Sequence, residues 1–583
     1  MRFLITTADE RSWRFDREVV FLGEWCLRYD RADHWAGSDA VMASAFCPTG
    51  PERDAALAEV DRVSLQLLAE LGNSLNAQHG LDADARFWRI LLGHWINRYT
   101  SVLFHRWHAV RLMLAEHEIA GTIVFTSPGL SLAVNDTDSF TWACNDDVWN
   151  NLLIGDLVQR LSKVPIEYLP VSIAGIPSRG KPRPQGLAAR AARLLQKDTD
   201  SLILNSYLPL GIALQVHLGL REVPQQRSTP AVPQVPADPA LRARLRDAQH
   251  GAAHPAANPS EDFAAYARDM LFQMLPTCFL EGFPALQREV AGLDWPGRPR
   301  FVFTSVSFDA DEVFKLWAAR RVAEGRPYFL GQHGNNFGTA RYCASETECL
   351  ATGDAFLTWG WTENDKCVPT FIFKTAGRQQ RHDPQGGLLL VELSLPHRFL
   401  PWDPYPEFTI YQEDQFVFAG ELPDVIRAGL TVRLHAEHRR HPWCEVQRWR
   451  QREPQITLDA GTRPVAALLA GSRLVVHSYD STGILESLSL DVPTVCFWSG
   501  GLEHLRESAV PYYRTLVDAG ILHLTASGAA RHVAQIWNDV DAWWRSAPVQ
   551  AARLQFCERY ARRSTAPVRE LVSLLGGTKG SSK

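Results

Sequence analysis

The chain has 583 residues, of which 46% are apolar and 21% are charged. Both fractions are close to globular averages, which excludes a long disordered or fibrous protein. The formal net charge of −5 lacks the basic excess that nucleic-acid binders carry. At roughly 100–200 residues per domain, the length predicts two to four domains.

The cysteines and the most apolar segments indicate the compartment. Ten Cys are scattered without a C-x-x-C pair, a pattern typical of reduced thiols in a cytosolic protein. The N-terminal residues lack the apolar core of a signal peptide. The charge-free run 201–220 contains Asn205, Pro209 and His217, which favours a buried strand, a turn and a helix over a membrane span. We therefore expect a cytoplasmic protein without a transmembrane segment, with attachment to the inner membrane through partners as the alternative.

The first 260 residues mix short apolar strands with long helical segments. Apolar residues recur with helical period across 52–118, which predicts a helical insert. Its aromatic band of Trp88, Trp95 and Trp107 favours core packing, with sugar stacking by an exposed member as the alternative. Seven prolines in 221–260 predict a loop or linker. The other predicted elements are strands at 1–7, 19–22, 121–128 and 201–209 and a helix at 146–161.

From residue 300 onward, short apolar strands alternate with helices. This alternation predicts βαβ units and parallel sheets. A break at 376–386 separates two series, so we expect an α/β protein of two Rossmann-like domains, 1–380 and 386–545, followed by helices at 546–574 and a disordered tail at 575–583. The predicted strands are 300–305, 327–334 and 355–361 in the first series and 387–393, 431–435, 473–478 and 494–498 in the second.

A glycine-rich turn at 331–339 follows the predicted strand PYFL (327–330). Ligands of open α/β sheets bind at the carboxyl ends of strands, so Gln332, His333, Gly334 and Asn335 are candidate substrate-loop residues. An imidazole there can act as a general base or contact a phosphate. The alternative is a turn whose histidine makes only a local hydrogen bond. The sequence of the turn is neither a P-loop nor G-x-G-x-x-G.

A second candidate site lies where the strand 473–478 meets a helix. Ser478, Ser481, Thr482 and Gly483 cluster at this junction, and free N–H groups at a helix start bind anions. Glu486, four residues after Thr482, is a candidate ligand of ribose hydroxyls. The alternative is an ordinary Ser N-cap with a solvent-facing glutamate.

Two further strand ends carry charged side chains. Arg433 and His435 alternate to the same side of an extended strand, which suits a phosphate or carboxylate ligand; a charged sheet edge is the alternative. Asp309 and Glu312 follow the strand 300–305, and neighbouring strands would bring them near His333. One of them is a candidate nucleophile or base. The alternative is acidic residues that cap the next helix.

Four longer motifs stand out along the chain: FLGEWC (21–26), RFWRILLGHW (86–95), GQHGNNFG (331–338) with FLTWGW (356–361), and HSYDSTGILESL (477–488). Together they resemble a family of transferases from bacterial surface-carbohydrate and flagellar-glycosylation loci. The resemblance covers nearly the whole chain. More distantly, the Gln-His-Gly turn and the late helix start look like those of capsule Kdo transferases and CDP-glycerol glycerophosphotransferases.

The distant resemblance implies the GT-B architecture, in which two Rossmann-like domains face each other across a cleft. It implies that Ser481, Thr482 and Glu486 hold the phosphate and ribose of a nucleotide. It also implies that Arg433 and His435 add phosphate contacts and that His333 faces the reacting centre from the other domain. GT-B enzymes generally use no catalytic metal, so neither a metal nor a bound cofactor is expected.

We therefore expect a glycosyltransferase that moves a nucleotide-activated sugar onto a surface glycan, a lipid-linked precursor or flagellin. The distant resemblance favours a CMP-linked donor, such as CMP-Kdo or a CMP-nonulosonic acid. The alternatives are phosphotransfer from a CDP-alcohol and a non-catalytic glycan-binding or assembly protein. The acidic balance makes nucleic acid an unexpected partner.

Overall fold

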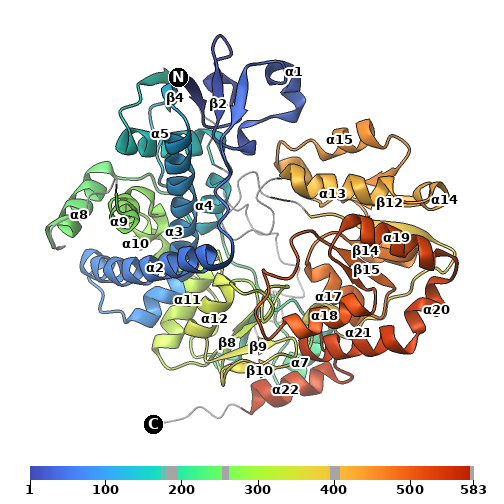
Figure 1. Ribbon diagram of the computed structural model, residues 1–583. Helices are drawn as coiled ribbons and strands as arrows, with labels where there is room; N and C mark the ends of the chain where they lie inside the picture. The colour runs from blue at the N-terminus through green and yellow to red at the C-terminus, as the bar shows by residue number, and fades with distance from the viewer. Residues whose placement is uncertain (173–174, 177–194, 253–260, 394, 396–407, 578–583) are drawn as a thin grey trace.

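The computed structural model describes residues 1–172, 175–176, 195–252, 261–393, 395 and 408–577. These residues form three parallel sheets with helices packed around them (Figure 1). Residues 578–583 of the predicted tail lie outside the described part. The described chain contains no helix that is both long and apolar enough to cross a lipid bilayer.

The first sheet is built from short apolar strands near the N-terminus. Its order is β3-β2-β1-β4-β5, with every neighbouring pair parallel. The helix α5 packs against β4. The bounds are β1 (Arg2–Ile5), β2 (Val19–Phe21), β3 (Ala40–Met42), β4 (Ile119–Thr126), β5 (Ile166–Pro170) and α5 (Asp147–Leu161).

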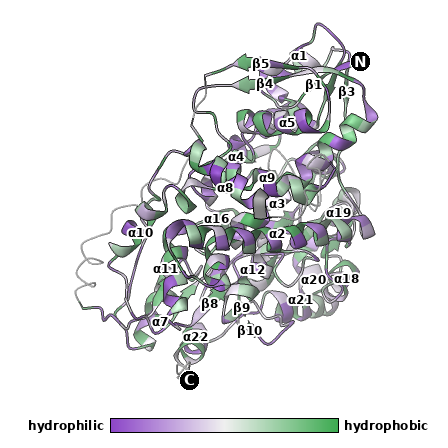
Figure 2. Cartoon of the chain, turned by 90° about the vertical axis from the view of Figure 1, so that its left-hand side faces the viewer, coloured by the Kyte–Doolittle hydropathy of each residue, from purple (hydrophilic) through white to green (hydrophobic). Residues whose placement is uncertain are grey.

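Two long helices connect β3 to β4 and occupy the predicted insert. They are α2 (Gly50–His79) and α3 (Ala85–Glu116). Asp84 caps α3 by accepting from the Phe87 N–H at 2.7 Å. Helix α3 packs against α2, α5, α9, α11 and α12, so it joins the first sheet to the second. In Figure 2, α2 presents both hydrophilic and hydrophobic residues, consistent with a helix buried along one face.

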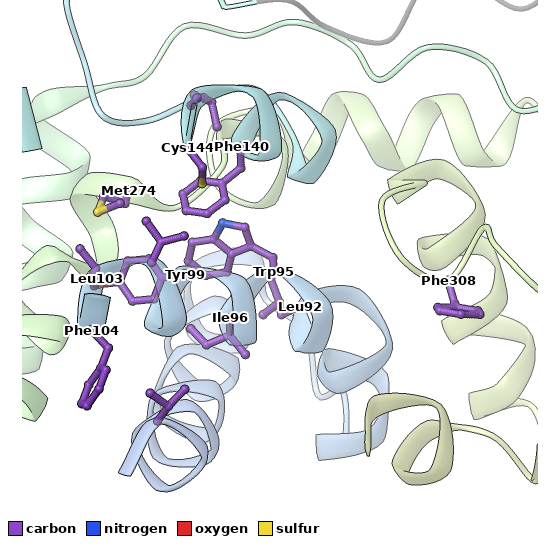
Figure 3. Packing of buried hydrophobic residues seen from close by; sticks show 14 of the residues in the cluster. Leu92, Trp95, Ile96, Tyr99, Leu103, Phe104, Phe140, Cys144, Met274 and Phe308 are labelled. Carbon is purple, nitrogen blue, oxygen red and sulfur yellow. The ribbon is translucent and has the colours of Figure 1, made fainter. Parts of the chain in front are cut away.

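The aromatic band of the insert is core, as the favoured interpretation held. Trp88, Trp95 and Trp107 are at most 5% exposed, which leaves none of these rings exposed for sugar stacking. Trp95 stacks on Tyr99 at 5.1 Å between ring centroids and meets the edge of Phe140 at 6.0 Å (Figure 3). Burial of such large rings makes α3 the centre of the largest apolar cluster, which extends into both neighbouring sheets.

The middle sheet has the order β10-β9-β8-β7-β6 and is also parallel. Helices α11 and α12 pack between it and α3. On the other side, α7 and the last helix, α22, pack on each other, so the end of the described chain returns to this unit (Figure 1). The bounds are β6 (Leu202–Leu204), β7 (Val302–Thr304), β8 (Tyr328–Gly331), β9 (Ala355–Thr358), β10 (Cys367–Pro369), α7 (Leu210–Gly219), α11 (Glu312–Ala323), α12 (Ala344–Thr352) and α22 (Pro567–Gly576).

The C-terminal sheet has the order β13-β12-β11-β14-β15-β16. Its strands β11 (Gly387–Val391) and β14 (Ser472–His477) are almost fully buried. The helix α17 (Thr482–Ser489) follows β14 directly. The other bounds are β12 (Leu430–Arg433), β13 (Thr457–Asp459), β15 (Thr494–Phe497), β16 (Leu522–His523), α13 (Phe408–Gly420), α14 (Asp424–Arg427), α15 (Glu445–Arg452), α16 (Val465–Ala470), α18 (Val510–Asp518), α19 (Ala526–Ile536), α20 (Val540–Arg545) and α21 (Ala547–Tyr560).

The α/β class with parallel sheets is confirmed, and two expectations need correction. Residues 1–380 contain two sheets rather than one, because β1 to β5 pair among themselves and not with β6 to β10 in the described chain.

The segment 221–260, expected to be a loop or linker, contains the helix α8 (Pro239–Ala252). Pro239 is tolerated because it stands at the first helical position. In the first turn of α8, Arg242 forms an ion pair with Glu281 at 2.7 Å, which anchors the helix to the rest of the protein. The remaining helices are α1 (Ala32–Trp35), α4 (Thr137–Ala143), α9 (Phe263–Met274) and α10 (Phe283–Ala291).

Candidate functional site

A cavity of about 770 Å³ lies between the middle sheet and the C-terminal sheet. One wall comes from the loops after β8 and β10, with two residues of α2 beside them. The opposite wall comes from the carboxyl ends of β11, β12, β14 and β15, where ligands of open α/β sheets bind. Of the predicted site residues, the cavity gathers Asn335, Arg433, His435, Ser481, Thr482, Gly483 and Glu486.

The side chain of Gln332 holds the loop after β8 in place through three hydrogen bonds. Its Oε1 accepts from the Trp359 N–H at 2.9 Å and from the Trp361 Nε1 at 2.8 Å, while its Nε2 donates to the Gly334 carbonyl at 2.9 Å. All these groups are buried, so the side chain has no free polar group for a substrate. Gln332 is a positioning residue, and the predicted substrate contact is not made by its side chain.

Asn335 links this loop to the C-terminal sheet through two hydrogen bonds. Its N–H donates to the Thr482 Oγ1 at 3.0 Å, and its Nδ2 donates to the Asp480 Oδ1 at 2.7 Å. Gly334 is close behind, because a Cβ there would stand 3.1 Å from the Thr482 Oγ1. The Gly-rich turn and the start of α17, separated by about 150 residues of chain, therefore form one structure.

The start of α17 combines a helix cap with a close backbone approach. Ser481 caps the helix, since its Oγ accepts from the Ile484 N–H at 3.3 Å. This is the ordinary N-cap that the sequence left open, although Ser481 also lines the cavity. A Cβ on Gly483 would stand 2.7 Å from the Cε1 of His477, so only glycine lets the buried imidazole lie under the helix start. Burial lowers the pKa of His477 to about 3, which keeps its ring neutral.

Arg433 and His435 line the cavity at the end of β12, the strand next to β11. Val391 pairs with Arg433 on one side and with His477 on the other, so the arginine and the start of α17 flank the same strand. Among the described residues, no carboxylate lies within ion-pair distance of Arg433, and its buried Nε has no hydrogen-bond partner. The Nδ1 of His435 accepts from the Glu437 N–H at 3.2 Å, and burial lowers the pKa of this imidazole. The Nη1 and Nη2 of Arg433 donate only long bonds, each 3.4 Å, to the carbonyls of Leu434 and Arg463, so this guanidinium is available to an anion.

Glu486 is paired with a lysine that the sequence did not single out. The Lys374 Nζ lies 3.1 Å from its Oε1, and both side chains are about one-third exposed. Such pairs are worth at most about 1 kcal/mol, so a ligand that bonds either group replaces the pair readily. The same ammonium lies 4.9 Å from the centre of the Tyr207 ring, which stacks on His333.

His333 and Asp309 lie beside the cavity rather than in its wall. The His333 ring packs among Tyr207, Phe308 and Phe337, and burial lowers its pKa. Burial alone would raise the pKa of Asp309, but the charge of Arg98 at 3.2 Å and the nearby His94 hold it below its usual range. This paired carboxylate is a poor nucleophile.

Glu312 and Ser478 have structural environments. The side chains of Glu312 and Lys315 are 0% exposed and lie 3.0 Å apart, so Glu312 has no access to a substrate. The Ser478 Oγ donates to the Val391 carbonyl at 3.2 Å and contacts the Tyr411 hydroxyl at 2.9 Å. The sequence suggested a catalytic role for Glu312 and a phosphate role for Ser478; burial of both side chains corrects these two expectations.

Several cavity residues were missed by the sequence analysis. Glu392 directly follows β11, so the rule that ligands bind at strand ends would have selected it. Asp480 lies within the motif HSYDSTGILESL, but nothing in the sequence predicted a role for it. His504 and Lys374 lie farther along the loops that follow β15 and β10, so this rule does not select them.

Glu392 lines the cavity and is buried near a second buried carboxyl group, that of Glu445. Its Oε1 accepts from the Trp449 Nε1 at 3.0 Å. Burial and the nearby Glu445 raise the pKa of Glu392 well above its usual value. Burial likewise raises the pKa of Glu445 to about 8. The shift favours the uncharged form of Glu392, whose N–H donates to the Arg433 carbonyl at 3.0 Å, and so disfavours a negative charge beside Arg433.

Glu445→Gln is expected to stabilise the protein at pH 8 more than at pH 5. A folded-state pKa raised above the unfolded value makes stability fall as pH rises from about 4.5 to 8, because unfolding then releases a proton. The glutamine removes this loss, which is on the order of 1–3 kcal/mol at pH 8 relative to pH 5. Urea denaturation at both pH values measures it. An equal effect of the substitution at both pH values would show that Glu445 is ionised in the fold.

The sequence of the whole chain places these features in a known family. A model of the LIC12162 family transferases matches residues 2–575. The chain belongs to this family. Its members are described as transferases, so the two-walled cavity belongs to a transferase. Among curated proteins, no relative matches the chain.

Solved structures share the fold of this transferase only distantly. Staphylococcus aureus MnaA with UDP is 11% identical over 65% of this chain and 96% of that one, with a TM-score of 0.33. Anabaena HepE with UDP and glucose is 12% identical over 65% and 98%, with the same TM-score. WaaG, a glycosyltransferase of lipopolysaccharide biosynthesis, is 9% identical over 65% and 99%, with a TM-score of 0.28. At these values the likenesses support no functional conclusion.

Proposed function

We propose that this transferase is a glycosyltransferase that binds a nucleotide-activated sugar in the cavity between the middle and C-terminal sheets. The observation that carries the proposal is Arg433, a cavity-lining guanidinium with a buried, unpartnered Nε, beside the start of α17. A guanidinium and free helix N–H groups together form a site for a phosphate.

The surroundings of Arg433 suit a nucleotide better than an isolated phosphate. A cavity of about 770 Å³ falls within the range of small-molecule sites and has room for a base, a ribose and a sugar. Trp498 and Tyr479 add aromatic surface to its wall. Glu486 and Lys374 can separate, the carboxylate to accept from ribose hydroxyls and the ammonium to meet a phosphate oxygen.

Transfer of the sugar requires the nucleotide to leave as an anion. Arg433, Lys374 and the α17 N-terminus would stabilise the charge that develops on the leaving phosphate, which lowers the barrier. The finer identity of the substrates rests on the resemblance of the sequence motifs. We propose a CMP-linked donor, such as CMP-Kdo or a CMP-nonulosonic acid, and a surface glycan, lipid-linked precursor or flagellin as acceptor.

Nucleotide binding tests this proposal. The full chain is expected to bind one of CMP, UDP and GDP, as measured by isothermal titration calorimetry and by the shift of its melting temperature. At 100 times the dissociation constant, binding adds about 2.7 kcal/mol to the free energy of unfolding. The proposal predicts CMP as the tightest ligand.

Two results would change the assignment. If none of the three nucleotides binds at millimolar concentration, the cavity is not a nucleotide site. If CMP binds but a CDP-alcohol yields a phosphodiester product, the reaction is phosphotransfer.

A further inference from the structure

A histidine–carboxylate pair lies in the wall of the same cavity. The His504 Nε2 lies 3.1 Å from the Asp480 Oδ2. Both residues line the cavity, and their side chains are 19% and 10% exposed. They follow adjacent parallel strands, Asp480 after β14 and His504 after β15, so the sheet itself brings them together.

Asp480 is held in place by donors from three parts of the chain. Besides His504, it accepts from the Asn335 Nδ2 at 2.7 Å and from the Tyr513 hydroxyl at 3.0 Å. Asn335 belongs to the loop after β8 and Tyr513 to α18. A carboxylate with three donors has a defined orientation, and so does any group that bonds to it.

The histidine is fixed from its other sides as well. Its carbonyl oxygen accepts from the Arg341 N–H at 2.8 Å, and its ring meets the edge of Trp498 at 5.8 Å. The hydrogen bond to Asp480 requires the proton on Nε2, which leaves the lone pair on Nδ1. No described residue bonds this Nδ1. The ring therefore offers one oriented acceptor at the seam between the two sheets.

We propose that His504, oriented by Asp480, is the general base that activates the acceptor. This inference rests on the proposed glycosyl transfer. His504 Nδ1 takes the proton of an acceptor hydroxyl while that oxygen bonds to the anomeric carbon of the donor. The bond from this carbon to the phosphate oxygen breaks, and its electron pair leaves with the nucleotide. The Asp480 carboxylate stabilises the imidazolium that forms.

The position of His504 suits this role better than that of His333. His333 is packed among three aromatic rings outside the cavity lining, and no carboxylate is within ion-pair distance of its ring in the described chain. His504 lies in the lining, next to the anion site and at the edge of the loop that crosses from the middle sheet.

The test measures release of nucleotide from UDP-glucose, GDP-mannose and CMP-N-acetylneuraminic acid by the full chain, with water as the acceptor. His504→Gln keeps a donor for Asp480 but has no basic nitrogen. It is expected to lower the turnover number by about 100-fold or more, with the dissociation constant of the nucleotide changed less than about threefold. Imidazole in the buffer is expected to restore part of the rate of His504→Ala, which a purely structural residue would not show.

The chain offers a matched control in the pair of His382 and Asp541, which lie 2.9 Å apart outside the cavity lining. His382→Gln is expected to leave both the rate and nucleotide binding unchanged. An unchanged rate in His504→Gln with nucleotide binding intact would overturn the inference, as would a wild-type protein that binds nucleotide but releases none from all three donors. Loss of nucleotide binding in the wild type would instead overturn the proposed function.

Discussion

Arg433→Met is expected to weaken nucleotide binding by about 10- to 100-fold. A hydrogen bond to a charged group contributes about 1.5–3 kcal/mol, and each 1.4 kcal/mol is a factor of ten in the dissociation constant. The effect on folding should be small, because no described carboxylate forms an ion pair with this guanidinium, and its bonds to the carbonyls of Leu434 and Arg463 are long at 3.4 Å. Methionine keeps much of the aliphatic stem, so the cavity wall is retained. Calorimetric titration with CMP, UDP and GDP gives the dissociation constants.

Arg452→Met is the matched control for this change. Arg452 lies on α15 of the same sheet unit, but its side chain is 61% exposed and pairs with Glu413 at 3.2 Å. It should leave the dissociation constant unchanged. The contribution of Arg433 should also decline as salt is raised, because ions screen a partly exposed charge. Equal affinities for Arg433→Met and the wild type would remove the anion site from the mechanism.

Lys315→Met is expected to lower the free energy of unfolding by about 3–5 kcal/mol. The substitution leaves Glu312 buried without its cation, and an unpaired buried charge is strongly destabilising. The Lys315 Nζ also donates to the Asp309 carbonyl at 3.2 Å, so that acceptor loses its partner too. Chemical denaturation followed by tryptophan fluorescence measures the change.

The exposed pair of Glu59 and Arg62 has the same spacing along a helix and serves as the comparison. Arg62→Met should cost no more than about 1 kcal/mol, because solvent-exposed pairs contribute little. The double variant Glu312→Gln, Lys315→Met should regain much of the loss, because it buries no charge. If Lys315→Met were as stable as the wild type, Glu312 would have to be neutral or hydrated in the fold.

The strands and their order along the chain were largely predictable. Apolar runs such as 387–393 and 473–478 match β11 and β14 because a strand buried on both faces must be apolar throughout. The insert at 52–118 matches α2 and α3 because helical periodicity is a local property. Pairing between strands is not local. The sequence therefore could not show that β1 to β5 form a sheet of their own.

The same distinction between local and non-local features applies to the candidate site. Arg433, Thr482, Gly483 and Glu486 were found from the sequence because a strand end or a helix start identifies each of them. The same rule also selected Glu312, whose side chain turns into the core to pair with Lys315. The direction in which a side chain points depends on what packs against its helix, so a local sequence pattern does not predict it.

Residue types and local periodicity were enough to predict an α/β protein with parallel sheets and to select the start of α17 as the proposed anion site. The tertiary structure alone decided which groups share the cavity. Asn335 meets Asp480, and Lys374 meets Glu486, across more than 100 residues of chain. These contacts exist because two separately folded sheets present their loops to each other. The chemistry of the cleft is therefore a property of that packing, and strand patterns alone do not encode it.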